Sequence, residues 1–420
     1  MGSVPSEKTI ELHGRTYHLP TRPVVIVCVD GFDPTYLQAG IEAGILPTMA
    51  RWVQSGFHAT ATCAMPSVTN PNNLCIITGV PTSVHGISGN YYLDKDSGEE
   101  VMVLDASKMR GETILERMAR AGVRVAAITA KDKLRRIINH GLEPGKGGAI
   151  CFSSQFADQC TVEEHGISDV EAWLGKSTPP QYSGELSLFV LDAGLKLLQE
   201  KRADLFYLTL SDYIQHKHAP GSDEADDFFR KLDARLGEFE RLGAVVAVTG
   251  DHGMSDKSDD EGKPNAFFLE DFLNEKFPQS GARVMCPIAD PFVKHHGALG
   301  GFVRVHLTGT DKSAQLVEEM IRQCQQIPQV EVAMSGKEAA AKFEMPEDRE
   351  GELVVIARSN AVIGSRKEAH DLSQLDGHRL RSHGGLSEQH IPLLRSVKAD
   401  MPIAGKSLRN FDVFDLALNY

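Results

Sequence analysis

The sequence predicts an α/β fold: a mainly parallel sheet with helices on both faces, and a small α+β unit inserted late in the chain. Apolar runs rich in β-branched residues, at 23–30, 123–129, 204–210 and 244–249, are typical of strands buried in a parallel sheet. Helical patterns alternate with these runs through the first half of the chain, as strand–helix–strand units require.

The predicted helices have recognisable ends. Pro47 suits the first turn of a helix over 47–55, and Gly122 suits the end of a helix over 113–121. Apolar stripes of helical period predict two longer helices, over 186–200 and 227–242. Residues 63–73 carry two prolines and three asparagines, which predict a loop with an Asn-Pro-Asn bend directly after Thr69.

The pattern changes after Asp256. Residues 257–264 are charged and are expected to form a linker, and strands at 303–307, 330–334 and 352–357 then alternate with helices at 313–325 and 337–343. We therefore expect a core domain whose first part is 20–256, an inserted cap domain at 257–370, and a completing part of the core at 371–420. The completing part contains a final strand at 391–394.

Composition excludes some classes of protein. Of the 420 residues, 41% are hydrophobic and 24% charged, as in an ordinary globular protein, and the net charge of −13 argues against a nucleic-acid binder. No apolar run approaches the roughly 18 residues of a membrane span. The N-terminus has no secretory pattern, and seven scattered cysteines without CxxC pairs indicate reduced thiols, so a cytoplasmic location without membrane contact is expected.

Metal-capable side chains follow three of the predicted buried strands. Asp30 ends the first run, Asp212 follows the third, and Asp251-His252 follows the fourth. The carboxyl ends of parallel strands meet at one edge of the sheet, where open α/β folds bind their ligands. One such pair has an ordinary reading as a turn cap with an incidental histidine, but the repetition at three strand ends favours a site.

These residues divide into two sets of metal ligands. Asp212 and His216 are four apart, so a helical turn would place them on one face. The first set is Asp212, His216 and His383, the last of which precedes the final predicted strand. The second set is Asp30, Asp251 and His252. Mixed imidazole and carboxylate ligation suits two zinc ions, with iron or manganese as weaker choices, and ions roughly 4 Å apart suit in-line displacement at phosphorus.

Some of these assignments have competitors. Asp212 could instead cap a helix. The competing histidines are His218, beside His216, and His378 and His390, near His383. The sequence assigns no role to His295-His296.

Thr69 is placed to be the nucleophile and an added ligand of the second ion. A hydroxyl bound to a metal loses its proton readily, in the way that bound water does. Without the metals, a threonine that hydrogen-bonds its own turn would be the better reading.

Two lysines follow the predicted strand at 123–129. In an extended segment the side chains of Lys131 and Lys133 would point to the same side, toward the site. Two ammonium groups beside a phosphoryl site suit a small substrate with a second anionic group, most simply a carboxylate. Arg135 and Arg136 fit the solvated face of a following helix.

The set Asp30, Thr69, Asp212-x-x-x-His216, Asp251-His252 and His383-Gly-Gly, in that order, resembles the alkaline phosphatase superfamily over nearly the whole chain. The resemblance implies a three-layer α/β/α sandwich, two metal ions and a Ser or Thr nucleophile that becomes phosphorylated. The stretch HGISGNYYLD resembles the nucleotide pyrophosphatase/phosphodiesterase branch, which implies that Asn90 contacts a phosphoryl oxygen. An insert between Asp251-His252 and His383 matches the cap position of several members.

Three longer stretches, MPSVTNPNNLCIITGVPTSVHGISGNYYLD, TAKDKLRR and HHGALGGFV, most resemble the phosphonoacetate hydrolases of this superfamily. That resemblance implies hydrolysis of the carbon–phosphorus bond of phosphonoacetate, with a carboxylate beside the lysines. The alternatives are a phosphodiesterase, nucleotide pyrophosphatase or phosphomonoesterase of the same superfamily, a phosphate-transferring mutase, and a non-enzymatic anion- or metal-binding protein. A homodimer is compatible with the sequence.

Overall fold

A seven-stranded sheet forms the centre of the larger unit in the computed structural model, which describes residues 8–146, 148–291, 296–375, 377–400 and 407–420. In sheet order the strands are β4 (Phe57–Thr62), β19 (His390–Arg395), β10 (Val245–Thr249), β3 (Val24–Cys28), β9 (Leu205–Thr209), β7 (Val125–Thr129) and β8 (Ala149–Ser153). The five from β10 to β8 are parallel, and β19 runs antiparallel to both of its neighbours. The mainly parallel sheet is therefore confirmed, and the final strand is its antiparallel member.

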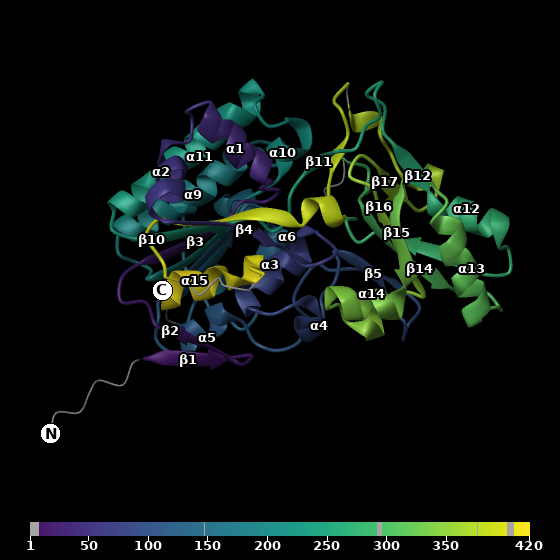
Figure 1. The fold of residues 1–420 in the computed structure, drawn as a ribbon. Helices are drawn as coiled ribbons and strands as arrows, with labels where there is room; N and C mark the ends of the chain where they lie inside the picture. The colour runs from purple at the N-terminus through teal and green to yellow at the C-terminus, as the bar shows by residue number, and fades with distance from the viewer. Residues whose placement is uncertain (1–7, 147, 292–295, 376, 401–406) are drawn as a thin grey trace.

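Helices cover both faces of this sheet (Figure 1). One face carries α1 (Pro34–Glu42), α2 (Pro47–Ser55), α9 (Glu185–Gln199) and α11 (Asp223–Arg241), with the short α7 (Val162–His165), α8 (Val170–Leu174) and α10 (Tyr213–Lys217) nearby. The other face carries α3 (Thr69–Thr78), α5 (Ile114–Arg120), α6 (Asp132–Ile138) and α15 (Val413–Asn419), with α4 (Thr82–His85) following α3. Each face has its own apolar core, so the expected three-layer α/β/α sandwich is confirmed.

A separate four-stranded antiparallel sheet lies beside the core in Figure 1. Its order is β13 (Ala282–Met285), β14 (Phe302–Leu307), β16 (Leu353–Ala357) and β15 (Val330–Ser335). Its helices are α12 (Leu269–Lys276), α13 (Ala314–Cys324) and α14 (Gly336–Phe343). The chain leaves the core through β11 (Ser255–Asp256) and returns through β18 (Arg381–Ser382), and these two strands pair with each other. On this ground we propose 257–370 as the inserted unit, which is the division expected from the sequence.

Three smaller strand pairs complete the architecture. β1 (Thr9–Leu12) pairs with β2 (Arg15–His18), β5 (Tyr91–Leu93) with β6 (Glu100–Met102), and β12 (Ala266–Phe268) with β17 (Val362–Gly364). Within the described ranges, no helix has the length and apolar character needed to cross a bilayer.

We expected residues 257–264 to form a linker, but its first residue, Lys257, is buried rather than exposed. The side chain of Lys257 is fully buried, and its Nζ lies 2.9 Å from Glu388 Oε1 and donates to the carbonyl of Ser359 at 2.9 Å. A lysine can be buried when its charge is paired and hydrogen-bonded. The partner is 131 residues away in the chain, so local sequence gave no sign of it.

Candidate active site

Three neighbouring strands of the large sheet deliver the acidic residues to one edge. Asp30 follows β3, Asp251 follows β10 on one side of it, and Asp212 follows β9 on the other. Because β10, β3 and β9 are parallel and adjacent, their carboxyl ends bring the three carboxylates together. All three are buried.

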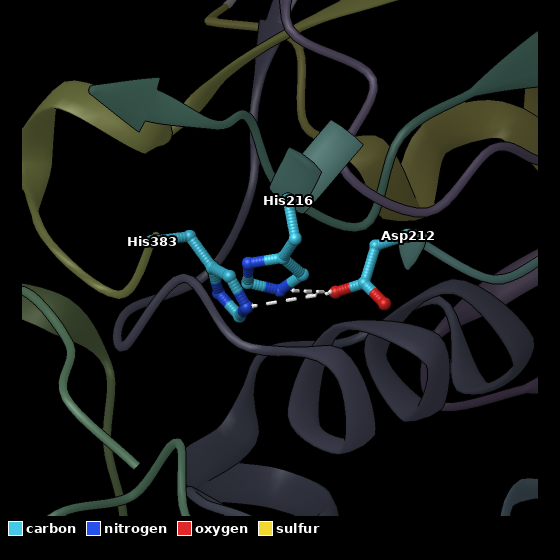
Figure 2. A group of neighbouring side chains, drawn as sticks. All are labelled: Asp212, His216 and His383. Carbon is cyan, nitrogen blue, oxygen red and sulfur yellow. Dashed lines mark ion pairs between the residues drawn. The ribbon is translucent and has the colours of Figure 1, made fainter. Parts of the chain in front are cut away.

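Asp212, His216 and His383 form the first group (Figure 2). Their ligand atoms lie within 4.8 Å of one another. Asp212 Oδ2 is 2.9 Å from His216 Nε2 and 3.8 Å from His383 Nε2. Asp212 precedes the first residue of α10, and the His216 amide donates to the Asp212 carbonyl, which is the helical turn expected from their spacing.

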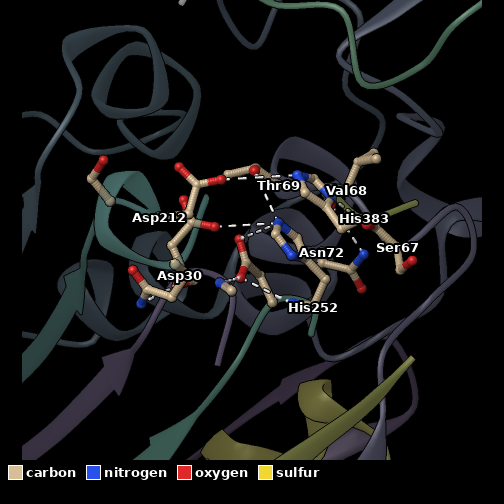
Figure 3. Close-up of polar contacts among 12 residues, drawn as sticks. Asp30, Ser67, Val68, Thr69, Asn72, Asp212, His252 and His383 are labelled. Carbon is tan, nitrogen blue, oxygen red and sulfur yellow. Dashed lines mark hydrogen bonds and ion pairs between the residues drawn. The ribbon is translucent and has the colours of Figure 1, made fainter. Parts of the chain in front are cut away.

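Asp30, Asp251 and His252 form the second group, which contacts Thr69 (Figure 3). His252 Nε2 lies 3.2 Å from Asp30 Oδ1 and 3.7 Å from Asp251 Oδ2. Thr69 Oγ1 is 3.3 Å from the same nitrogen. The rings of His252 and His383 stack with their centroids 3.6 Å apart, so the two groups are in contact.

Each histidine of the two groups has its Nδ1 at a backbone carbonyl. The partners of His216, His252 and His383 are the carbonyls of Arg381, Gly253 and Ser67, all at 2.8 Å. A carbonyl only accepts, so Nδ1 carries a proton and Nε2 faces the group. This is the tautomer that a metal-binding histidine needs.

The buried carboxylates and imidazoles of the two groups shift one another's pKa values. Burial, then repulsion from Asp30, raises the pKa of Asp251 well above its usual range. Burial acts to lower the pKa of His252, but Asp251 and Asp30 outweigh it and raise that pKa to about 10. Burial and the neighbouring His252 lower the pKa of His383. Buried carboxylates need paired cations, so this donor set fits divalent metal ions.

Thr69 is the first residue of α3, so the expected Asn-Pro-Asn bend is wrong: Asn70, Pro71 and Asn72 are helical. Pro71 lies in the first turn, where proline is tolerated because helix amides there lack intrahelical partners. The end of α3 that carries Thr69 is its positive end, which favours an anion near Thr69. Thr69 itself is only half-buried, unlike the metal-capable residues around it.

Two asparagines that the sequence analysis did not single out hold this helix. The amide nitrogen of Asn73 donates to the Thr69 carbonyl at 3.0 Å and to Asp251 Oδ2 at 3.2 Å. Its oxygen accepts from the Tyr207 and Thr209 hydroxyls at 2.7 and 2.9 Å. Asn72 instead bonds the loop before Thr69, through the backbone of Ala64, Pro66 and Val68. Their spacing from Thr69, three and four residues as on one face of a helix, is the sequence feature that could have identified them.

The two lysines reach the site differently from the expected extended segment. Lys131 immediately precedes α6 and Lys133 lies in its first turn, so they do not alternate as in a strand. Lys131 Nζ lies 3.3 Å from Asp212 Oδ1, whereas Lys133 Nζ forms an ion pair with Asp290. Burial and repulsion from Lys131 lower the pKa of Lys133 to about 7. The adjoining Asp290 carboxylate opposes this and favours the ammonium form.

Asn90 lies next to the start of α3. Its side-chain oxygen accepts from the backbone N–H of Asn70 at 3.1 Å, and its backbone N–H donates to the Pro287 carbonyl at 2.8 Å. A buried Asn90 therefore connects the residue after Thr69 to the segment after β13.

The remaining histidines lie outside the two groups. His218 contacts Glu224 at 3.5 Å and the edge of His378, and His390 is exposed in β19. His296 stacks on His216 with ring centroids 4.9 Å apart, while His295 lies outside the described residues. Arg136 is exposed as expected, but Arg135 is buried against Asp132, so a solvated face is wrong for Arg135.

Residues 24–385 match the sequence profile of the type I phosphodiesterase / nucleotide pyrophosphatase family. The chain belongs to this family. Among curated family relatives, an uncharacterised pyrophosphatase/phosphodiesterase of Schizosaccharomyces pombe is 25% identical over 292 residues, which is 64% of this chain. A phosphonoacetate hydrolase of Penicillium oxalicum is 68% identical over 39 residues, which is 9% of this chain. The matches span about half the length of these relatives, 53% and 54% respectively.

Solved structures extend the comparison. Two crystal structures of phosphonoacetate hydrolase from Sinorhizobium meliloti 1021, in complex with phosphonoformate or phosphonoacetate, are 44% identical with a TM-score of 0.93. Each comparison covers 99% of both chains. Human ectonucleotide pyrophosphatase / phosphodiesterase 5 is 14% identical over 94% of this chain and 93% of its own, with a TM-score of 0.61, which shows a shared fold.

Proposed function

We propose that this protein hydrolyses the carbon–phosphorus bond of phosphonoacetate to give acetate and phosphate. The observation that carries the proposal is the combination of a half-buried Thr69 on the second carboxylate–imidazole group with two lysines beside the first. The 44% identity to a phosphonoacetate hydrolase, over nearly the entire length of both chains, supports the same substrate.

We infer that each group binds one zinc ion. Asp212, His216 and His383 would bind one, and Asp30, Asp251 and His252, with Thr69, would bind the other. Histidine nitrogen and carboxylate oxygen are the donors that zinc prefers when cysteine is absent, and iron or manganese fit less well. When bound, the two ions would lower the pKa of the Thr69 hydroxyl and neutralise charge on the phosphonyl oxygens.

Thr69 would act as the nucleophile. Its hydroxyl proton passes to solvent water and its oxygen forms a bond to phosphorus, while the carbon–phosphorus bond breaks and its electron pair leaves with the methylene carbon. That carbanion is delocalised into its carboxylate and takes a proton from water to become acetate. A second water then hydrolyses the phospho-threonine, which releases phosphate and restores Thr69.

Three groups of the chain would stabilise the charges that develop in this reaction. Lys131 and Lys133 would offset the second negative charge on the leaving acetate. The side chain of Asn90 and the positive end of α3 would face the phosphonyl oxygens.

The test is an assay of phosphate release from phosphonoacetate against a bis-nitrophenyl phosphate diester. Hydrolysis of phosphonoacetate, with little turnover of the diester, is the expected result. The reverse preference would favour a phosphodiesterase or nucleotide pyrophosphatase of the same family and overturn the proposal.

Replacement of the lysines tests recognition of the carboxylate. Lys133→Ala should reduce kcat/KM for phosphonoacetate by about 10²-fold, the order of a lost charge-assisted contact in a buried site, and affect a nitrophenyl phosphate monoester much less. Equal losses on the two substrates would mean that Lys133 does not read the carboxylate.

A further inference from the structure

The two lysines proposed to bind the substrate carboxylate have different partners in the protein. Lys131 contacts Asp212, a residue of the first metal group, from the same core unit. Lys133 forms its ion pair with Asp290, which comes from the inserted unit, 157 residues further along the chain. Both side chains of the second pair are largely buried, with 7% of Lys133 and 13% of Asp290 exposed. Lys133 is therefore already paired with a carboxylate before any substrate arrives.

The segment that carries Asp290 is fixed against the site. Asp290 follows β13 by a short turn in which the Ala289 amide donates to the Cys286 carbonyl at 3.0 Å. The carbonyl of Pro287 in this turn accepts from the Asn90 amide at 2.8 Å. The two segments approach closely at Gly89, where a Cβ atom would lie 3.1 Å from the Pro287 side chain. The hydrogen-bonded segments around Asn90 and Pro287 therefore include both Asn90, which lies beside α3, and Asp290, which pairs with Lys133.

We propose that Asp290 competes with the substrate for Lys133: its carboxylate pairs with Lys133 in the empty site and is exchanged for the carboxylate of the incoming substrate. The inference rests on the proposed function, because it assumes that Lys133 receives the substrate carboxylate.

The exchange occurs only with a ligand that carries a carboxylate. A ligand with a carboxylate gives Lys133 a new partner as Asp290 leaves, so the buried ammonium is never unpaired. A ligand that has a phosphonyl group but no carboxylate provides no replacement, and Asp290 stays in place. The 13% of the Asp290 side chain that is exposed gives its carboxylate access to water after the exchange. The internal pair therefore weakens binding of a ligand that has a carboxylate, leaves binding of a ligand without one unchanged, and keeps the buried Lys133 ammonium paired in the empty site.

The experiment measures equilibrium binding to the metal-loaded protein with Thr69→Ala, in which turnover is removed. Phosphonoacetate and methylphosphonate are titrated calorimetrically into this background and into the same background with Asp290→Asn. Removing the internal carboxylate should tighten phosphonoacetate binding about tenfold, the order of one charge-assisted contact, and leave methylphosphonate binding unchanged. Asp290→Glu, which keeps the charge, should restore the original affinity.

An exposed acid elsewhere in the inserted unit provides the matched control. Asp311→Asn removes the same charge at an exposed position between β14 and α13 and should leave both affinities unchanged. Unchanged or weakened phosphonoacetate binding in Asp290→Asn, or an equal change for both ligands, overturns the proposal. If the Thr69→Ala protein with Asp290 unchanged binds phosphonoacetate no more tightly than methylphosphonate, the proposed function itself is overturned. This outcome differs from those that overturn the role of Asp290.

Discussion

Each histidine of the two metal-capable groups is oriented by a carbonyl on its far nitrogen. His383 is bound in this way to the Ser67 carbonyl, in the loop that leads to Thr69. The same loop bonds back to the His383 segment through Ser67 Oγ, which donates to the Gly385 carbonyl at 2.7 Å. The ring of His383 and the start of α3 are therefore positioned by a single set of contacts.

Replacing His383 should remove one metal ion. His383→Ala leaves the first group with two ligands while the second group keeps its own, so the metal content should fall from about two ions per chain to about one. Elemental analysis of the dialysed protein measures this. His378→Ala is the control and should keep both ions; the opposite pattern would assign the ligand role to His378.

The lowered pKa of the buried His306 predicts that the free energy of unfolding depends on pH, whether or not metal ions are bound. Burial, then the nearby Arg304, Lys95, Arg283 and Lys312, lower its pKa to about 3. Because the folded pKa lies below the ordinary 6.5, the neutral ring stabilises the fold above pH 6.5, and this contribution is lost as the pH falls toward 3.

The measurement is denaturant unfolding of the metal-free protein at several pH values between 7.5 and 5. Relative to His306→Asn, the wild type should lose about 1.4 kcal/mol per pH unit of unfolding free energy below pH 6.5. Parallel pH profiles of the two proteins would show that His306 does not titrate as described.

At the scale of elements, helix α3 connects the nucleophile to the sheet. Asn73, one turn after Thr69, is bonded to the Thr69 carbonyl, to Asp251 and to two side chains of β9. Asn73→Ala should therefore reduce metal affinity or turnover by about 10–100-fold, as is usual for groups that orient ligands.

Asn274, in the inserted unit, provides a control for the general effect of losing an asparagine's hydrogen bonds. Asn274→Ala removes two bonds to the backbone of Ala282 in the inserted unit and should leave turnover unchanged. Equal losses in the two variants would mean that Asn73 acts only through stability.

The sequence predicted the strands better than α3. Asp30, Asp212 and Asp251 follow apolar runs that can be read locally, and buried parallel strands place such residues together. In α3, asparagine and proline are typical of turns, and the sequence near α3 does not show that Asn72 and Asn73 also bond side chains distant in the chain, those of Asn410 and Tyr207. Asp290 was not predicted for the same reason, because nothing near Lys133 in the chain identifies its partner.

At the scale of the whole molecule, a buried ion pair joins the inserted unit to the loop after His383. Lys257 binds Glu388 and the carbonyl of Ser359, and Glu388 also accepts from the Gly385 amide at 2.9 Å. The pair holds together three segments: the exit from the core, the end of the inserted unit, and the return to the core.

Removing one partner should be costly. Lys257→Met leaves a buried carboxylate without its cation, so the free energy of unfolding should fall by about 3–5 kcal/mol in denaturant titrations. Adding Glu388→Leu to that variant should recover part of the loss, because no buried charge then remains. A double variant less stable than the single one would contradict this account of the pair.

The central claim is that Thr69 attacks phosphorus within a two-metal site. Its most direct test is phosphate release from phosphonoacetate by Thr69→Ala, compared with the wild type at equal metal content. The proposed mechanism predicts a loss of at least about 10³-fold in kcat, as is usual when a nucleophile is removed, with both metals retained. Turnover of Thr69→Ala close to that of the wild type would contradict it.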